Sequence, residues 1–262
     1  MSKPESLPLL LERDGTIATL SFNRPEALNA INVPMAQAFL HTMQQLAADA
    51  TLRCLVLRGA GRGFMAGGDL ATLATDPAQG AADLLGPLNQ AVELLAQLNA
   101  PVIAQVHGVA AGAGLSLMLQ ADFIYAAEGT RFNPAYINIG TSCDVGASWA
   151  LPRRVGLTRA LEIAMLGETL DCAAAEHMGL VNRILPPSEL DTTVQALAQR
   201  LAAGPTLALG QMRRLMRGGL HNDLPTQLTA EAQAFMACAE GTDLRHGIAA
   251  FLTRQKPSFQ GH

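Results

Sequence analysis

Two glycine-rich segments could bind an anion through their backbone amides. The first spans residues 59–70 (GAGRGFMAGGDL) and the second spans residues 108–114 (GVAAGAG). Small side chains expose backbone N–H groups and let a ligand approach the main chain closely. Two such amides that converge on one point form an oxyanion hole, in which each donor is worth roughly 3 to 4 kcal/mol in a transition state. Tight turns with close strand–helix packing would explain either segment alone.

One acidic residue, Asp144, lies within the stretch 141–149 (TSCDVGASW), downstream of the second segment. No Asp or Glu occurs from residue 94 to 121 or from 129 to 143. Burial would raise the pKa of this carboxyl toward the range required of a general base. The alternative role is a helix N-cap, which Asp fills well, with Gly146 and Ser148 at first-turn positions. Cys143 is interpreted as a packed thiol, because no histidine is paired with it.

The hydrophobic pattern places both glycine-rich segments directly after buried strands. Strands are predicted at 54–57, 101–106 and 123–125, after a hairpin of 8–12 and 17–22 joined by Asp14-Gly15. Helices are predicted at about 34–48 and 82–98, where apolar residues recur at helical spacing. This alternation predicts an α/β layered core with mainly parallel pairing.

The pattern becomes helical from about Ser188 onward. Helices are predicted at 190–201, 206–216, 225–239 and 243–254. We therefore expect an N-terminal α/β core over residues 1–187 and a C-terminal helical region over residues 188–262.

Several familiar site motifs fail on spacing. The dinucleotide pattern GxGxxG needs glycine where Phe64 and Leu117 stand, and no Gly-Lys pair supplies a phosphate-binding P-loop. The nucleophile-elbow pattern GxSxG fails at Met118. The six histidines include no HxxxH pair, so no metal site is expected.

Composition narrows the class of protein further. The chain has 262 residues, of which 49% are hydrophobic and 15% charged, with a net charge of −4. This excludes a disordered chain and predicts no general attraction to nucleic acid. No apolar run reaches the length of a membrane span, and four widely spaced cysteines are typical of a reducing compartment. We expect a soluble cytoplasmic protein whose low charge suits subunit interfaces.

Motifs along nearly the whole chain resemble the crotonase, or enoyl-CoA hydratase/isomerase, superfamily. They are NRPEALNAIN (23–32), GRGFMAGGDL (61–70), PVIAQVHGVAAGAG (101–114), ADFIYA (121–126), LPRRVG (151–156) and FLTRQKPSFQG (251–261). The resemblance implies the α/β crotonase (ClpP/crotonase-like) fold, with a layered ββα spiral core and a C-terminal helical trimerisation region. It further implies an acyl-CoA thioester substrate and a homotrimer or dimer of trimers. Coenzyme A belongs to that substrate, and no separate cofactor is implied.

The resemblance also assigns site residues. The oxyanion amides fall on Ala66 and Ala113. The substrate- and coenzyme-binding positions are Ala27, Leu28, Ala66, Gly67, Gly68, Asp69, Leu70, Gly112 and Trp149. Asp69 is expected to brace the oxyanion loop rather than to do chemistry. Arg254 and Lys256 are candidates for the coenzyme A phosphates, possibly across a subunit boundary, or for a solvated helix end.

The residues at two family positions decide between reactions. Hydratases of this family use two glutamates, and here those positions carry Ser116 and Ala135. Neither residue can hold a water as a carboxylate base would. The stretch DVGASWALPR (144–153) resembles the isomerase branch, which includes ring isomerases of phenylacetate breakdown. There one aspartate shuttles a proton, which implies Asp144 as the sole acid/base.

Other reactions stay open on the sequence alone. A hydratase-like lyase and a catalytically silent acyl-CoA-binding member are the alternatives to the isomerase. A dehalogenase would need a histidine before the strand at 101, and none occurs between His41 and His107. The acyl group is not fixed, although its pocket is expected to come from residues 70–98 and 132–149.

Overall fold

A six-stranded sheet forms the centre of the computed structural model, which describes residues 7–262. Its order is β1-β2-β3-β4-β6-β8, and only β1 and β2 pair antiparallel. The strands are β1 (Leu9–Asp14), β2 (Ile17–Phe22), β3 (Cys54–Gly59), β4 (Val102–Val106), β6 (Phe123–Ala127) and β8 (Arg183–Leu185). The predicted hairpin and the mainly parallel pairing are confirmed.

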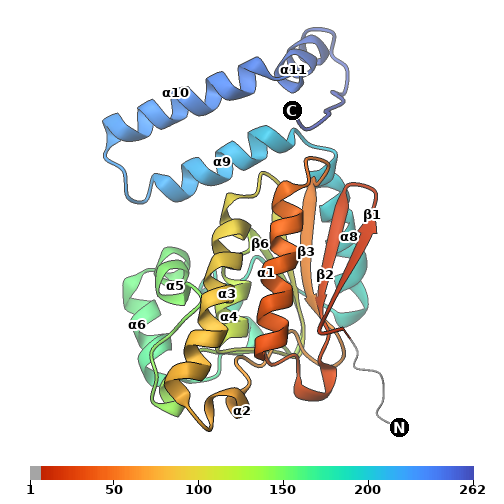
Figure 1. Cartoon of the computed structure of the whole chain (residues 1–262). Helices are drawn as coiled ribbons and strands as arrows, with labels where there is room; N and C mark the ends of the chain where they lie inside the picture. The colour runs from red at the N-terminus through yellow and green to blue at the C-terminus, as the bar shows by residue number, and fades with distance from the viewer. Residues whose placement is uncertain (1–6) are drawn as a thin grey trace.

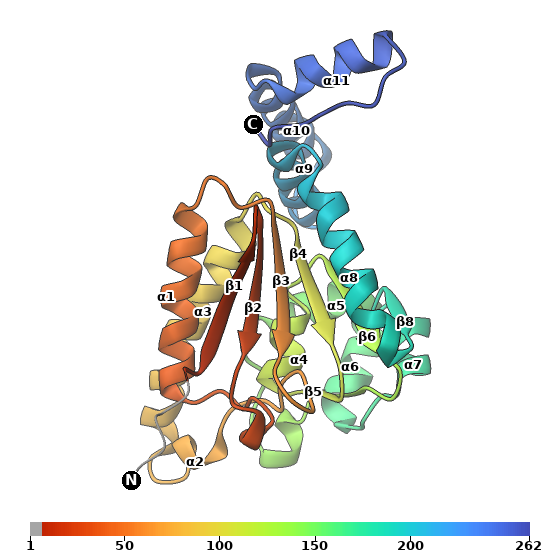
Figure 2. The same cartoon turned by 90° about the vertical axis from the view of Figure 1, so that its right-hand side faces the viewer.

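Helices cover both faces of this sheet (Figure 2). On one face, Leu55 and Leu57 of β3 pack in a cluster with α1 (Val33–Ala48) and α3 (Pro77–Gln97). On the other face, Cys54 and Val56 pack in a second cluster with α8 (Pro187–Ala202). Because β3 is buried on both faces, its sequence is a continuous apolar run rather than an alternating one.

Helix α1 shows how the sequence sets these elements. The side chain of Asn32 accepts a hydrogen bond of 3.1 Å from the Met35 amide, which caps the helix start. Met35, Phe39, Met43 and Leu46 are buried, at the spacing of one helix face. The predicted start near Pro34 is therefore confirmed.

The boundary expected at residue 187 divides the helices differently from the structure. The sequence places the helix at 190–201 in the C-terminal region, whereas α8 packs on the sheet through Leu190, Val194 and Ala198. The helices that stand apart at one end of the molecule are α9 (Thr206–Gly218), α10 (Leu224–Glu240) and α11 (Asp243–Leu252) (Figure 1).

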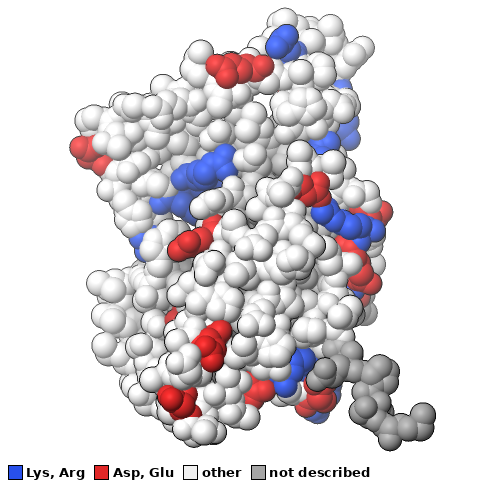
Figure 3. Space-filling model, viewed as in Figure 1, with Lys and Arg blue, Asp and Glu red and all other residues white. Residues whose placement is uncertain are grey.

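Buried arginine contacts attach α9 to the core. Arg213 donates to Asp122 Oδ1 at 2.7 Å and to the carbonyls of Leu98 and Leu95 at 2.9 and 3.0 Å. Arg217 donates to the same Asp122 oxygen at 2.9 Å. Figure 3 shows sparse charge on this face of the molecule, with basic atoms gathered where the C-terminal helices meet the core.

The remaining elements are a second small sheet and several short helices. A second, two-stranded parallel sheet joins β5 (Val109–Ala111) to β7 (Arg131–Asn133). The helices are η1 (Pro25–Ala27), α2 (Leu70–Leu73), α4 (Ala113–Met118), η2 (Tyr136–Ile139), α5 (Ala147–Val155), α6 (Leu157–Leu166) and α7 (Cys172–His177). Within residues 7–262, no helix has the length and apolarity needed to cross a membrane.

Candidate active site

The two glycine-rich segments are hydrogen-bonded to each other. Phe64 donates its amide to the His107 carbonyl at 2.8 Å, and Met65 donates to Val109 at 3.0 Å. Ala111 returns a bond of 2.9 Å to the Met65 carbonyl. Because β3 and β4 are parallel neighbours, the loops that follow them meet at the same sheet edge. The two segments therefore meet at one edge of the sheet.

Glycine is required at this junction for two separate reasons. A Cβ on Gly114 would lie 2.4 Å from the Met65 carbonyl oxygen, so only glycine allows the two segments to approach this closely. Gly67 has a φ of +109°, a conformation that L side chains rarely adopt. Close packing and backbone exposure thus occur together in these loops.

A buried asparagine that the sequence analysis missed holds the first segment in place. Asn29 is fully buried, and its Nδ2 donates to the carbonyls of Ala60 and Gly63, both at 2.8 Å. Its Oδ1 accepts from the Arg24 amide at 2.9 Å. Asn29 also has a φ of +59°, which asparagine tolerates better than most residues. Its position inside the NRPEALNAIN motif is the only sequence signal for this role.

The two candidate oxyanion amides differ in their present partners. The Ala113 amide opens α4 and has no acceptor among residues 7–262. The Ala66 amide donates to the Leu28 carbonyl at 3.0 Å. The predicted coenzyme-binding edge at Leu28 thus adjoins the predicted oxyanion loop directly.

A cavity of about 270 Å³ lies beside these loops. Seven predicted site residues line it, namely Ala66, Gly67, Gly68, Leu70, Gly112, Ala113 and Asp144. Its apolar wall comes from α2 and α3, through Leu73, Ala81, Leu84, Leu85 and Leu88. Residues 135–144 supply the opposite part of the lining. Both ranges from which the acyl pocket was expected to come, 70–98 and 132–149, contribute to this lining.

Asp144 lies in this cavity in a chain of three polar side chains. The Tyr136 hydroxyl donates to Asp144 Oδ1, and it lies 2.6 Å from the Ser116 hydroxyl. Tyr136 is 8% exposed and Ser116 is fully buried. The sequence analysis missed Tyr136, although it directly follows Ala135 at one of the two diagnostic positions. Ser116, which stands at a position where hydratases of the family carry a glutamate, is therefore linked to Asp144 through the Tyr136 hydroxyl.

Burial raises the pKa of Asp144 above its ordinary value. The hydrogen bond from Tyr136 opposes this effect, because it stabilises the ionised carboxylate. Burial and the neighbouring negative charge together raise the pKa of Tyr136, so its hydroxyl keeps its proton. The result is one titratable acid with elevated proton affinity inside an apolar cavity.

Asp144 is not a helix cap. The N-cap of α5 is Gly146, with no side-chain capping bond, and the Asp144 carboxylate accepts from Tyr136 instead. Val145 has a φ of +50° and Ala135 has a φ of +61°. A β-branched residue in this region is strained, at a cost of order 1 to 3 kcal/mol. Unusual backbone therefore flanks both Asp144 and Tyr136.

Trp149 is absent from the residues that line the cavity, although the sequence analysis placed it among the substrate-binding positions. Its side chain is 40% exposed, and the Arg153 guanidinium lies 4.2 Å from its ring centroid. Residues four apart share one helix face. The face of α5 that carries Trp149 and Arg153 does not line the cavity. His221, from the loop before α10, lies against the same ring.

The other predicted site residues do not line the cavity. Asp69 caps α2 and forms an ion pair with Arg24 at 3.0 Å, and these contacts suit the bracing role expected of it. Ala27 ends η1, next to the Leu28 carbonyl already described. Arg254 and Lys256 follow α11, which lies at the opposite end of the molecule from α2, one of the helices that line the cavity (Figures 1 and 2).

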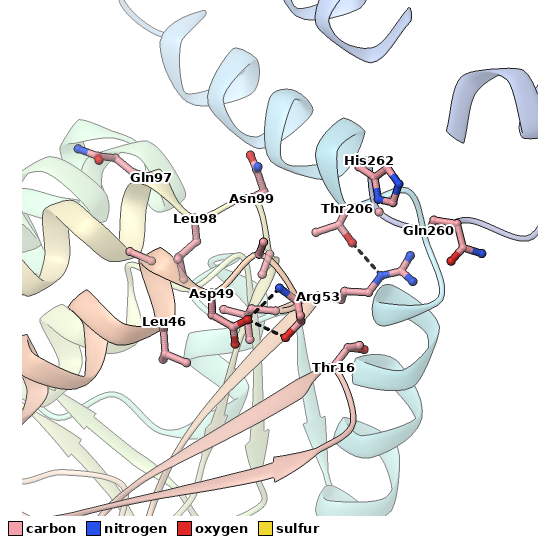
Figure 4. Close-up of a pocket in the computed structure, with 16 residues that line it drawn as sticks. Thr16, Leu46, Asp49, Arg53, Gln97, Leu98, Asn99, Thr206, Gln260 and His262 are labelled. Carbon is pink, nitrogen blue, oxygen red and sulfur yellow. Dashed lines mark hydrogen bonds between the residues drawn. The ribbon is translucent and has the colours of Figure 1, made fainter. Parts of the chain in front are cut away.

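A larger cavity, of about 570 Å³, is a different feature. It lies between the core and the C-terminal helices, where Arg53 donates to Thr206 Oγ1 at 3.1 Å (Figure 4). Arg53 also donates to the carbonyls of Phe259 and Gly204, so its guanidinium ties the chain end to the core. This cavity belongs to the junction of the two regions.

Comparisons with known proteins agree with this geometry. A family model described as enoyl-CoA hydratase/isomerase matches residues 12–262. The chain is 39% identical to the 1,2-epoxyphenylacetyl-CoA isomerase of Escherichia coli K12, covering 94% of this chain and 95% of that protein. It is 30% identical to the crotonyl-CoA hydratase of Syntrophomonas wolfei, covering 96% and 97% of the two chains.

Solved structures give the same result for the fold. The enoyl-CoA hydratase of Mycobacterium smegmatis superposes with a TM-score of 0.91 at 31% identity, covering 97% of this chain and 99% of that one. The enoyl-CoA hydratase of Bacillus anthracis gives a TM-score of 0.92 at 26% identity, covering 97% and 100%. The expected crotonase fold is confirmed, and the chain is a member of the enoyl-CoA hydratase/isomerase family.

Proposed function

We propose that this enzyme is an acyl-CoA isomerase that uses Asp144 as its only acid/base. The observation that carries the proposal is the lining of the cavity. Asp144 is the single carboxylate in that lining, and Ala113, whose amide is a candidate oxyanion donor, lines the same cavity. An oxyanion hole and one movable proton are sufficient for a double-bond shift. The proposal also takes support from the isomerase among the relatives.

The proposed reaction moves one proton and one double bond. Asp144 takes a proton from carbon 2 of a 3-enoyl thioester, and the electron pair moves onto the thioester oxygen. The amides of Ala66 and Ala113 stabilise the resulting dienolate. The same carboxyl returns the proton at carbon 4, which leaves the double bond between carbons 2 and 3. The Ala66 amide, which now donates to the Leu28 carbonyl, would donate to the thioester oxygen as well or instead.

Hydration requires more than this cavity offers. Ala135 has no functional group, and the fully buried Ser116 is engaged with Tyr136. Asp144 alone would have to activate a water and protonate carbon 2, two tasks that general acid–base catalysis usually divides. A hydratase-type lyase is the alternative, because several relatives carry hydratase names.

The acyl group is proposed to be apolar beyond its thioester. The wall from α2 and α3 consists of aliphatic side chains, and the polar groups gather at residues 141–144. Straight-chain 3-enoyl and ring-derived acyl groups both suit this lining. A panel of acyl-CoA thioesters covering 2-enoyl, 3-enoyl and aryl-ring epoxide groups tests the choice. Turnover of 2-enoyl-CoA alone would replace the isomerase with the hydratase.

We further propose a homotrimer or dimer of trimers. Arg254 and Lys256 follow α11, which lies at the end of the molecule away from α2 (Figure 1), so another subunit would bring them to a bound coenzyme A. Large apolar side chains on α10 and α11 are exposed, including Phe235 at 64% and Phe251 at 83%. Light scattering after gel filtration should give three or six copies. A monomer that turns over acyl-CoA would contradict this assembly.

A further inference from the structure

The acid/base of this cavity is connected to a tyrosine and a serine that belong to different elements. Tyr136 comes from η2, Ser116 from α4, and Asp144 from the segment before α5. An ionised carboxylate can only accept, so the Tyr136 hydroxyl must donate its single proton to Asp144 Oδ1. The Tyr136 oxygen is then the acceptor for Ser116, at 2.6 Å. The chain of donors therefore runs from Ser116 through Tyr136 to Asp144.

We propose that Tyr136, oriented by Ser116, is a positioning residue that holds one oxygen of Asp144 and reserves the other for proton transfer. The inference rests on the proposed isomerase function and adds a part to its site. No other side chain among residues 7–262 donates to the Asp144 carboxylate. Oδ1 receives the tyrosine proton, so the proton taken from the substrate resides on Oδ2.

This arrangement has a consequence for the shuttled proton. A proton held on this one oxygen should be returned to carbon 4 before it exchanges with water. Tyr136 is 8% exposed and its pKa is raised by burial, so it does not compete for that proton. Retention of the substrate proton is therefore the signature of a correctly held Asp144.

Tyr136 is the main hydrogen-bond partner of the Asp144 carboxylate, because the nearby charged side chains are engaged elsewhere. The titratable side chains that line the cavity are Tyr136, Cys143 and Asp144. On α5, Arg153 lies over Trp149, and Arg154 donates to the Leu119 carbonyl at 3.1 Å. No lysine, arginine or histidine lines the cavity within the described part of the chain. Loss of the tyrosine hydroxyl should consequently raise the pKa of Asp144 further.

The decisive test measures Asp144 directly and needs no substrate. Aspartate labelled with ¹³C at the side-chain carboxyl is titrated by NMR, and the Asp144 signal is assigned by its loss in Asp144→Asn. In Tyr136→Phe the midpoint should move to higher pH, and in Ser116→Ala it should move less in the same direction. Tyr125→Phe removes the hydroxyl of the other tyrosine, on β6, and should change nothing.

Turnover supplies a second readout on a 3-enoyl-CoA in D₂O. Tyr136→Phe should lower kcat roughly ten- to a hundredfold with KM within about twofold, because Asp144 loses its orientation. The fraction of product with deuterium at carbon 4 should rise above the wild-type value. An unmoved Asp144 midpoint in Tyr136→Phe, or in Ser116→Ala if the first variant does not fold, overturns the proposal. If the wild type is inactive on every thioester, the isomerase function fails while the titration still decides this inference.

Discussion

The Tyr136 hydroxyl donates a hydrogen bond to Oδ1 of Asp144 inside the cavity that the two glycine-rich loops border. Burial raises the pKa of this acid, and the tyrosine limits the increase. An acid in such surroundings affects both the stability of the fold and the pH dependence of the reaction.

Asp144→Asn should make the protein more stable at neutral pH. Because the folded-state pKa of Asp144 is raised, the folded chain holds its proton more tightly than the unfolded chain does. Stability therefore falls as the pH rises through the window between the unfolded and folded pKa values. The asparagine variant lacks this penalty. Urea unfolding should show a gain at pH 7 that disappears at pH 3, and equal stabilities at pH 7 would contradict the raised pKa.

The isomerisation rate should rise with pH through the raised pKa of Asp144. Proton removal from carbon 2 needs the ionised carboxylate, so activity is lost as the pH falls below that pKa. The pH dependence of kcat/KM reports the free enzyme. Its acidic limb should lie above the ordinary range of an aspartate, and a limb within that range would contradict the prediction.

Gly114→Ala should destabilise the fold by about 1 to 3 kcal/mol, since it overpacks a closed junction. The new Cβ would meet the Met65 carbonyl oxygen at 2.4 Å. Gly247→Ala on α11 is the matched control, because its Cβ would make an ordinary contact of 3.5 Å with Phe259. That control should be neutral or slightly stabilising. Comparable denaturation midpoints for the two variants would refute the close approach of the loops.

Asn29→Asp should cost about 3 kcal/mol and raise KM for the thioester. The substitution points carboxylate oxygens at the carbonyls of Ala60 and Gly63, in place of the amide donor. The exposed Asn222, whose side-chain amide donates to Gln227 Oε1, provides the control Asn222→Asp, expected within about 0.5 kcal/mol. Equal effects at the two sites would show that Asn29 does not hold the loop.

Arg213→Met should cost about 3 kcal/mol or more. The substitution removes one of the positive charges that pair with the largely buried Asp122 carboxylate. It also leaves the Leu95 and Leu98 carbonyls without the hydrogen bonds that Arg213 donates. Arg159→Met removes an exposed pair with Glu162 and should stay within about 0.5 kcal/mol. Both unfolding curves need one protein concentration, because the proposed assembly would contribute to stability. A small effect of Arg213→Met would mean that α9 is held by other contacts.

The sequence was sufficient for the parts of the site that depend on the backbone. Glycine-rich loops after two parallel strands must meet at one sheet edge, and the structure brings Gly67 and Gly112 to one cavity. Side-chain partners were harder to predict. Tyr136 and Trp149 lie at similar distances from Asp144 in sequence, yet only Tyr136 lines the cavity with it.

The reason is the local backbone between these residues. Positive φ angles at Ala135 and Val145 set the directions of the neighbouring side chains, and neither residue type signals such a conformation. Asn29 escaped notice for a similar reason, since its carbonyl partners Ala60 and Gly63 lie more than thirty residues away in sequence. Long-range partners of one polar side chain become visible only in the folded chain.

The most direct test of the central claim is proton transfer by Asp144. A purified wild-type enzyme and Asp144→Asn are compared for isomerisation of a 3-enoyl-CoA and for hydration of the matching 2-enoyl-CoA. The wild type should isomerise far faster than it hydrates, and Asp144→Asn should lose isomerisation by a factor of at least about 10² while keeping its fold. Isomerisation that survives the substitution unchanged would contradict the account.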